Sequence, residues 1–235
     1  MKTIGLIGGM SWESTVVYYQ HLNRLARSRL GGLHSASLLL RSFDFAGIEA
    51  LQAKGDWESA TRAMIEAARS LERGGAECLL ICTNTMHLMA DAVQNAVDIP
   101  LIHIADVTAD AIKASACKTP LLLATRYTME QGFYRGRLRD HHGIASLVPE
   151  EAGRQTVHDI IYQELCQGIF RPESKQRMLD VVRTGLAQGA DSVILGCTEV
   201  GLLLSQQDMT GSLDAVVLDT TLLHAEAALD FALKP

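Results

Sequence analysis

The sequence predicts an α/β protein built from two similar subdomains with parallel sheets. Short apolar runs alternate with longer amphipathic segments along the whole chain, which is the pattern of parallel strands joined by helices. Residues 76–85 also align without gaps on residues 190–199, at an offset of about half of the 235 residues. A weaker echo pairs Lys2-Thr3 with Lys118-Thr119 and Tyr18-Tyr19 with Phe133-Tyr134. We therefore expect two α/β units related by pseudo-two-fold symmetry, with an active-site cleft between them.

The expected strands are the short apolar runs, because strands buried on both faces of a parallel sheet lack polar alternation. In chain order they are Thr3–Ile7, Ala36–Arg41, Cys78–Cys82, Leu101–Ile104, Pro120–Ala124, Val193–Leu195 and Ala215–Leu218.

The expected helices are the segments whose apolar residues recur with the helical period. They are Thr15–Arg29, Trp57–Arg73, Met129–His141, Gln155–Gln167, Glu173–Gln188 and Leu222–Leu233, with Ser11 as a cap for the first. The first subdomain is expected over residues 1–105, joined by a returning segment 217–235, and the second over residues 106–216.

Composition excludes several classes of protein. The net charge of −6 and the scattered Lys and Arg residues give no basic stripe, so nucleic acid is not an expected partner. The chain enters a strand pattern at Met1 without a charged leader, and no uncharged apolar run approaches 18 residues, so we expect a cytoplasmic protein with no membrane contact. Five cysteines without CxxC spacing are expected to be reduced thiols, and the histidine spacings predict no metal site.

The motif Gly196-Cys197-Thr198-Glu199 follows an apolar strand and leads into an expected helix. Gly196 permits a tight turn and Thr198 can cap. The positive end of a helix would lower the pKa of the Cys197 thiol, making it a candidate thiolate base or nucleophile. The alternative is a small buried residue that ends a strand.

The matching motif of the first half is Cys82-Thr83-Asn84-Thr85, which places Thr83 at the position equivalent to Cys197. Asn84 and Thr85 offer donors for a carboxylate, or a cap for the following helix. Successive side chains on a strand point to opposite faces, so Cys82 should face the core if Thr83 faces the cleft.

Two further segments carry polar or glycine-rich signals. Thr125 follows the first strand of the second half, where it can meet a carboxylate or cap a turn. The run Gly5 to Met10 lacks the GxGxxG spacing of a dinucleotide-binding loop. His87 is expected to be a helix-face histidine satisfied by a neighbour.

Three motifs together resemble the aspartate/glutamate racemase family over nearly the whole chain: Ile7-Gly8-Gly9-Met10-Ser11, Asn84-Thr85-Met86-His87 and Gly196-Cys197-Thr198-Glu199. The resemblance implies racemisation without pyridoxal phosphate or another cofactor, by one cysteine before the Asn and one in the Gly-Cys-Thr motif. This chain has Thr83 in the first position, and so resembles the branch with that threonine.

The resemblance implies that Thr83 and Cys197 are the catalytic residues, that the substrate is a small amino acid and that the protein is a homodimer. It implies substrate-binding roles for Met10, Gln52, Asn84, Thr85, Thr125 and Thr198. Gln52 is the candidate for the distal side chain of the substrate, with Arg41, Lys54, Arg126 and Glu164 as further candidates.

A threonine hydroxyl does not ionise near neutral pH, so Thr83 should be a poor base. Because the resemblance assigns deprotonation of the L-enantiomer to the second-half cysteine, turnover of L-substrate is expected to outrun turnover of D-substrate. Two alternatives remain open: a maleate isomerase or arylmalonate decarboxylase-like enzyme of the same fold, and a non-catalytic amino-acid-binding protein. Aspartate, glutamate and neutral amino acids are not distinguished.

Overall fold

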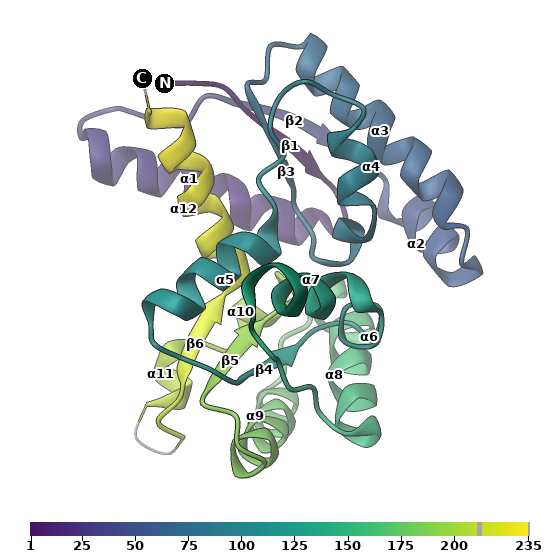
Figure 1. Ribbon diagram of the computed structural model, residues 1–235, viewed down its shortest axis with the longest axis vertical. Helices are drawn as coiled ribbons and strands as arrows, with labels where there is room; N and C mark the ends of the chain where they lie inside the picture. The colour runs from purple at the N-terminus through teal and green to yellow at the C-terminus, as the bar shows by residue number, and fades with distance from the viewer. Residues whose placement is uncertain (211–212, 235) are drawn as a thin grey trace. The chain divides into compact units, whose positions relative to one another are not determined.

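The computed structural model describes residues 1–210 and 213–234, and the chain divides into two compact units (Figure 1). Unit 1 comprises Met1–Ile104 with His224–Pro235, and unit 2 comprises Ala105–Leu223. Each unit contains a three-stranded parallel sheet with helices packed on it. The α/β architecture with two parallel sheets confirms the predicted fold class.

Unit 1 has the strand order β2-β1-β3. Its strands are β1 (Ile4–Gly8), β2 (Leu38–Ser42) and β3 (Cys78–Ile81). Its helices are α1 (Trp12–Leu30), α2 (Phe45–Lys54), α3 (Trp57–Arg73), η1 (Thr85–Met89), α4 (Ala90–Gln94) and most of α12 (Thr220–Leu233). Ser11 is the N-cap of α1, since its hydroxyl accepts from the amide of Ser14, and this confirms the predicted cap.

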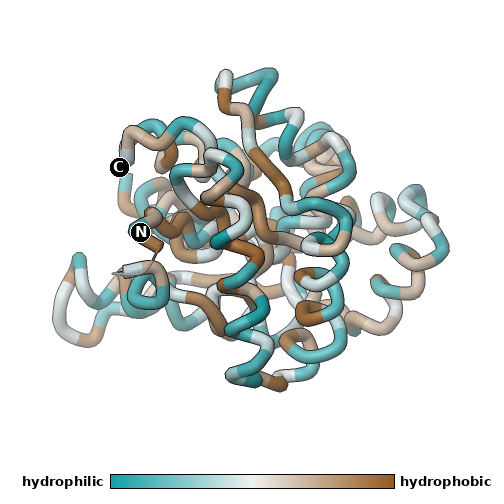
Figure 2. Tube along the Cα trace, turned by 90° about the horizontal axis from the view of Figure 1, so that it is seen from below, coloured by the Kyte–Doolittle hydropathy of each residue, from teal (hydrophilic) through white to brown (hydrophobic). Residues whose placement is uncertain are grey.

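The two faces of the unit 1 sheet bury different helices. Ile4 and Leu6 pack with α1 and α12 on one face, whereas Ile7 packs with α3 and α4 on the other. Figure 1 shows the purple α1 beside the yellow α12, and α3 on the opposite side of the sheet. Along the helices the trace alternates between hydrophilic and hydrophobic stretches (Figure 2), as expected for helices that bury one face.

Unit 2 has the strand order β4-β5-β6. Its strands are β4 (Pro120–Leu123), β5 (Ser192–Leu195) and β6 (Val216–Asp219). Its helices are α5 (Ile104–Ala114), α6 (Arg126–Glu130), α7 (Gly132–His142), α8 (Glu151–Gln163), η2 (Leu165–Gln167), α9 (Pro172–Ala187), α10 (Val200–Leu203) and α11 (Gln206–Met209). Within the described residues, every helix is too short or too polar to cross a membrane.

The internal echo of the sequence is visible in the hydrogen bonds. β3 and β5 occupy the aligned positions, and the acidic residue before each one binds the chain ahead of the neighbouring strand. The Glu77 carboxylate accepts from the amide of Thr3 at 2.8 Å, and the Asp191 carboxylate accepts from the amides of Lys118 and Thr119 at 2.6 and 3.1 Å. The two units therefore repeat the same strand pairing.

Each sheet also has a fourth position reduced to a single bridge. In unit 1 the bridge joins Leu79 of β3 to Leu101. Leu101 thus takes the place beside β3 that β6 takes beside β5 in unit 2. In unit 2 it joins Leu121 to Leu147, where β2 lies in unit 1. The two sheets therefore differ in the edge that carries a full strand, which is β2 beside β1 in unit 1 and β6 beside β5 in unit 2.

Four expectations need correction. Leu101–Ile104 is not a strand, because only Leu101 forms a bridge and α5 begins at Ile104. The predicted helix Met129–His141 is two helices separated at Gln131, and Gln155–Gln167 ends as the tighter turn η2. Residues 217–223 lie in unit 2, since β6 pairs with β5. Helices α2 and α5 were not predicted.

Candidate active site

Cys197 lies directly after the carboxyl end of β5, the central strand of unit 2. Gly196 precedes it because β4 comes very close: a Cβ at Gly196 would lie 2.5 Å from a side-chain carbon of Leu122 and 3.1 Å from the Cβ of Ala124. The amide of Gly196 donates to the carbonyl of Leu123 at 2.8 Å. Glycine is needed here for this close approach, and not for a tight turn as the sequence suggested.

The Cys197 thiol is held against a buried carboxylate. Its Sγ donates to Oε2 of Glu199 at 2.9 Å, and the hydroxyl of Thr198 donates to the same oxygen at 2.7 Å. Cys197 is 9% exposed and Glu199 only 2%. A thiol and its proton acceptor are therefore in direct contact at a strand end, where ligands bind in parallel α/β sheets.

This contact corrects the expected acidity of Cys197. Burial raises the pKa of the thiol well above its ordinary value, and the neighbouring charge of Glu199 raises it further. The expected helix is the four-residue α10, whose N-cap is Glu199, so it offers little compensating field. Thr198 is not a cap, because its hydroxyl is given to Glu199.

A half-buried cysteine from another segment also reaches Glu199. Cys166, in η2, donates from Sγ to Oε1 of Glu199 at 3.8 Å. Both oxygens of one carboxylate thus accept from thiols. The sequence predicts only that Cys166 is a reduced thiol, and 30 residues separate it from Cys197.

Thr125, after the adjacent strand β4, is the N-cap of α6 and accepts from the amide of Thr128. This bears out its alternative role as a cap. It is 6% exposed, and a hollow of about 300 Å³ begins at the next residue, lined by Arg126, Tyr127, Glu130, Gln131 and His158.

Thr83 occupies the corresponding place in unit 1, directly after β3, and is half-buried. Its carbonyl accepts from Nδ1 of His87 at 2.9 Å. Nε2 of the same ring then accepts from the amide of Ile104 at 3.3 Å, so the two bonds require the neutral ring with its proton on Nδ1. His87 therefore fixes the backbone at Thr83, which agrees with the expectation of a satisfied histidine.

The neighbouring Cys82 is fully buried in the cluster formed with α1 and α12. This burial also raises the pKa of its thiol, so Cys82 is expected to stay a neutral thiol. The expectation that Cys82 faces the core is confirmed.

Asn84 and Thr85 are 2% and 5% exposed at the start of η1. Asn84 makes no side-chain cap, and the element that follows is a five-residue 3₁₀ helix and not the expected α-helix. Both residues are thus buried close to the end of β3, and Asn84 does not cap the helix that follows.

Met10 and Gln52 are both buried in unit 1. Met10 is 4% exposed and belongs to the same cluster as Met86, and Nε2 of Gln52 donates to the sulfur of Met86 at 3.1 Å. Gly9 before Met10 has φ +81°, and a Cβ there would lie 2.3 Å from the carbonyl oxygen of Phe43. The structure brings Gln52 next to the residue that follows Thr85.

Comparison with known proteins decides the family. Residues 7–228 match the Asp/Glu/Hydantoin racemase family. The chain belongs to that family. Racemases are isomerases, so the expected family and the expected enzyme class are confirmed.

This racemase-family chain is similar to proteins of known structure. A candidate Asp/Glu racemase from Yersinia pestis is 50% identical with a TM-score of 0.90, and an aspartate racemase homologue from Pyrococcus horikoshii is 32% identical with a TM-score of 0.85; both matches cover 100% of each chain. The broad specificity amino-acid racemase RacX of Bacillus subtilis is 25% identical over 156 residues, which span 63% of this chain and 63% of that protein.

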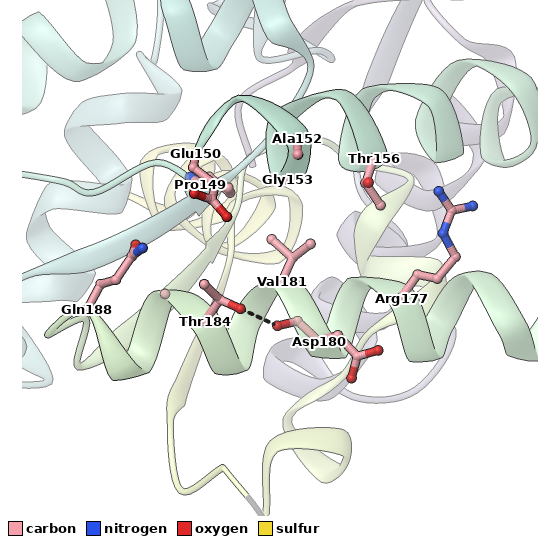
Figure 3. A pocket seen from close by; sticks show the side chains of 11 residues that line it. Pro149, Glu150, Ala152, Gly153, Thr156, Arg177, Asp180, Val181, Thr184 and Gln188 are labelled. Atoms are coloured by element: carbon pink, nitrogen blue, oxygen red, sulfur yellow. Dashed lines mark hydrogen bonds between the residues drawn. The ribbon is translucent and has the colours of Figure 1, made fainter.

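This racemase-family chain has two further cavities. One, of about 280 Å³, lies between α8 and α9, where Figure 3 shows Val181 and Arg177 on α9 across from Thr156 on α8. Another, of about 480 Å³, is lined in part by Arg41, Arg69 and Arg73. Arg41 is a further candidate for the distal side chain of the substrate, and it is the one predicted site residue that lines either of these two cavities. Among residues 1–210 and 213–234, no group of three His, Cys, Asp or Glu side chains is arranged to hold a metal.

Glu199 is a candidate functional residue that the sequence did not single out. It stood in the quoted motif, and its signal was a carboxylate two residues after the candidate thiol. Cys166 gave no such signal, because only the end of α8 brings it to Glu199.

Proposed function

We propose that the chain racemises an acidic amino acid, aspartate or glutamate, without a cofactor, using Cys197 and Thr83 at its two catalytic positions. The observation that carries the proposal is the 2.9 Å bond between the Cys197 thiol and the buried Glu199 carboxylate. Family membership supplies the reaction class, and the named relatives suggest the acidic substrate. We also propose that the protein is a cytoplasmic homodimer. Light scattering would measure its mass in solution.

Cys197 is the proposed base for the L-enantiomer. Its proton passes from Sγ to Oε2 of Glu199, giving a thiolate and a carboxylic acid. The thiolate then takes the α-proton, and the C–H electron pair is delocalised toward the substrate carboxylate. A base of raised pKa is well suited to a weak carbon acid, provided that a partner accepts its resting proton.

The Thr83 side is proposed to protonate the opposite face of Cα, from its hydroxyl or from a water that the hydroxyl holds. Asn84 and Thr85 are the proposed donors to the α-carboxylate, with Thr125 as a further donor. Met10 and Gln52 are proposed to contact the distal part of the substrate. Thr198 contributes by holding Glu199, since its hydroxyl is bonded there.

A single thiol makes the two directions unequal. The equilibrium constant between enantiomers is one, so kcat/KM must be equal in both directions. The bias therefore appears in kcat and KM separately, with a higher kcat expected for the L-substrate. It also appears in proton exchange, because Cys197 can return a solvent proton to the face from which it took one.

The proposal is tested by incubating each enantiomer of aspartate, glutamate and homoserine with the protein and separating the products by chiral chromatography. Interconversion of an acidic pair is expected, and Cys197→Ser should lower it by at least about 10²-fold. Cys82→Ala, a buried cysteine away from the strand end, should keep the activity. Absence of interconversion would contradict the proposal. Loss of CO₂ from an arylmalonate would then favour the decarboxylase alternative, and ligand-induced stabilisation without exchange a binding protein.

A further inference from the structure

In the proposed function, on which this inference rests, Cys197 must lose the proton that it takes from the L-substrate before it can act as a base again. In a racemase with thiols on both faces, a turnover in one direction leaves a proton on one thiol and a thiolate on the other, and the reverse reaction can use that form directly. In the proposed mechanism the second catalytic position is held by Thr83, whose hydroxyl does not ionise near neutral pH. After each L-to-D turnover, the proton on the 9% exposed Cys197 must therefore reach solvent by another route.

The hydrogen bonds around Glu199 outline one route. Oε2 accepts from Cys197 at 2.9 Å and Oε1 accepts from Cys166 at 3.8 Å. Cys197 and Glu199 are buried, whereas Cys166 is half-buried and its neighbours Gln167 and Gly168 are exposed. The carboxylate thus links an enclosed thiol to one near the surface.

The fold holds Cys166 in this place. Leu165 beside it is fully buried, and Glu164 accepts from the hydroxyl of Ser174 at 2.6 Å, which ties η2 to the first turn of α9. Gly168 ends η2 with φ +70°, a left-handed conformation that glycine adopts readily. Cys166 is therefore positioned by its neighbours on both sides.

We propose that Cys166 and Glu199 form a proton path that resets Cys197 by carrying its proton to solvent. The thiol proton of Cys197 moves to Oε2 of Glu199. The Cys166 thiol gives its own proton to a solvent base, and the resulting thiolate takes the proton of the Glu199 carboxyl group after that group rotates. Cys166 and Glu199 end unchanged, and one proton has moved from Cys197 to solvent.

Two substitutions separate a proton path from simple positioning. Cys166→Ser keeps a hydroxyl that can donate to Oε1 of Glu199 but does not ionise near neutral pH. Cys166→Ala removes both the hydrogen bond and the titratable group. Cys117→Ser is the matched control, because Cys117 is also half-buried and lies in a turn where its sulfur bonds to Ser115.

The first measurement uses substrate in D₂O. For the wild type and Cys117→Ser, recovered L-substrate should gain deuterium at Cα faster than D-product forms. In both Cys166 variants, the ratio of the deuterium-exchange rate in L-substrate to the racemisation rate should fall by about tenfold or more. Added imidazole, a small base that can carry protons, should restore this ratio. If Cys166→Ser behaves as the wild type while Cys166→Ala is impaired, Cys166 only positions Glu199, and the path is wrong.

The second measurement needs no substrate, so it separates failure of the path from failure of the proposed function. Infrared spectroscopy follows exchange of the Cys197 S–H to S–D after dilution into D₂O, with the band assigned by its loss in Cys197→Ser. Exchange should be about tenfold slower in Cys166→Ser than in Cys117→Ser. A slower exchange without any racemase activity would support the path and refute the function. An unchanged exchange rate in an active enzyme would overturn the path alone.

Discussion

The end of β5 in unit 2 and the end of β3 in unit 1 occupy matched places in the internal repeat, yet they differ in chemistry. At β5, the Cys197 side chain contacts a buried carboxylate that accepts its proton. At β3, the ordered contact involves the backbone, where His87 binds the carbonyl of Thr83. The comparison supports the proposal that the β5 end moves a proton, whereas at the β3 end it is the backbone of Thr83 that is fixed.

The largest expected effect comes from removing the carboxylate at the β5 end. Glu199→Gln should lower kcat for L-substrate by about 10²-fold, because the thiol loses its proton acceptor. The same substitution should speed alkylation of Cys197 by iodoacetamide, since the charge of Glu199 raises the pKa of the thiol. Mass spectrometry of the alkylated protein and steady-state kinetics measure the two effects. If kcat and the alkylation rate of Cys197 both fell, or both rose, the result would contradict this account of Glu199.

The next test makes the two strand ends alike. Thr83→Cys places a thiol on the unit 1 side, so kcat for D-substrate should rise by about tenfold, and recovered D-substrate should begin to gain deuterium in D₂O. Thr83→Ser keeps the hydroxyl and should leave the imbalance in place. Equal behaviour of the Cys and Ser variants would show that Thr83 is not the residue that limits the D-direction.

A smaller effect is expected from loosening the β3 end. His87→Ala removes the bond to the Thr83 carbonyl, and a displaced hydroxyl should lower kcat on the order of tenfold with both enantiomers. His87→Gln retains a side-chain donor and should recover part of the activity. Unchanged kinetics in His87→Ala would mean that the backbone at Thr83 is held adequately by η1 alone.

The smallest effect on activity is expected from His224, whose protonation should instead change the stability of the protein. In unit 1, Nε2 of His224 donates to the Ile102 carbonyl and Nδ1 accepts from the Tyr18 hydroxyl. Burial lowers the pKa of His224 from 6.5 to about 4. Because the unfolded chain binds the proton more readily, the free energy of unfolding should fall by about 3 kcal/mol as pH drops from 6.5 to 4.

Urea unfolding across this pH range measures the loss due to His224. His224→Gln should remove that part of the pH dependence, whereas the exposed His34→Gln should retain it. The same slope in all three proteins would assign the loss to other groups.

Much of the fold was predictable because the repeat is carried by local patterns. The echo between residues 76–85 and 190–199 located β3 and β5, and the strand period placed Cys82 in the core. Leu101–Ile104 misled because its apolar composition is that of a strand, although the amide of Ile104 binds His87 and α5 starts there. Local composition does not report which edge of a sheet is completed.

The sequence predicted that Thr83 and Cys197 follow two matched strands, but it did not predict the electrostatics around Cys197. The motif around Cys197 identified the thiol, but the expected helix field proved to be a single short turn, and burial beside Glu199 reversed the direction of the pKa shift. The contact with Cys166 depends on where α8 ends in space. Such effects arise from tertiary packing, which a motif of four residues does not encode.

The central claim, that proton chemistry is concentrated at Cys197, is tested most directly by following deuterium at Cα from each enantiomer separately in D₂O. The account predicts that recovered L-substrate gains deuterium faster than it racemises, whereas recovered D-substrate gains none ahead of racemisation, and that Cys197→Ser loses both processes. Equal deuterium gain in the two recovered enantiomers, with exchange retained in Cys197→Ser, would contradict it.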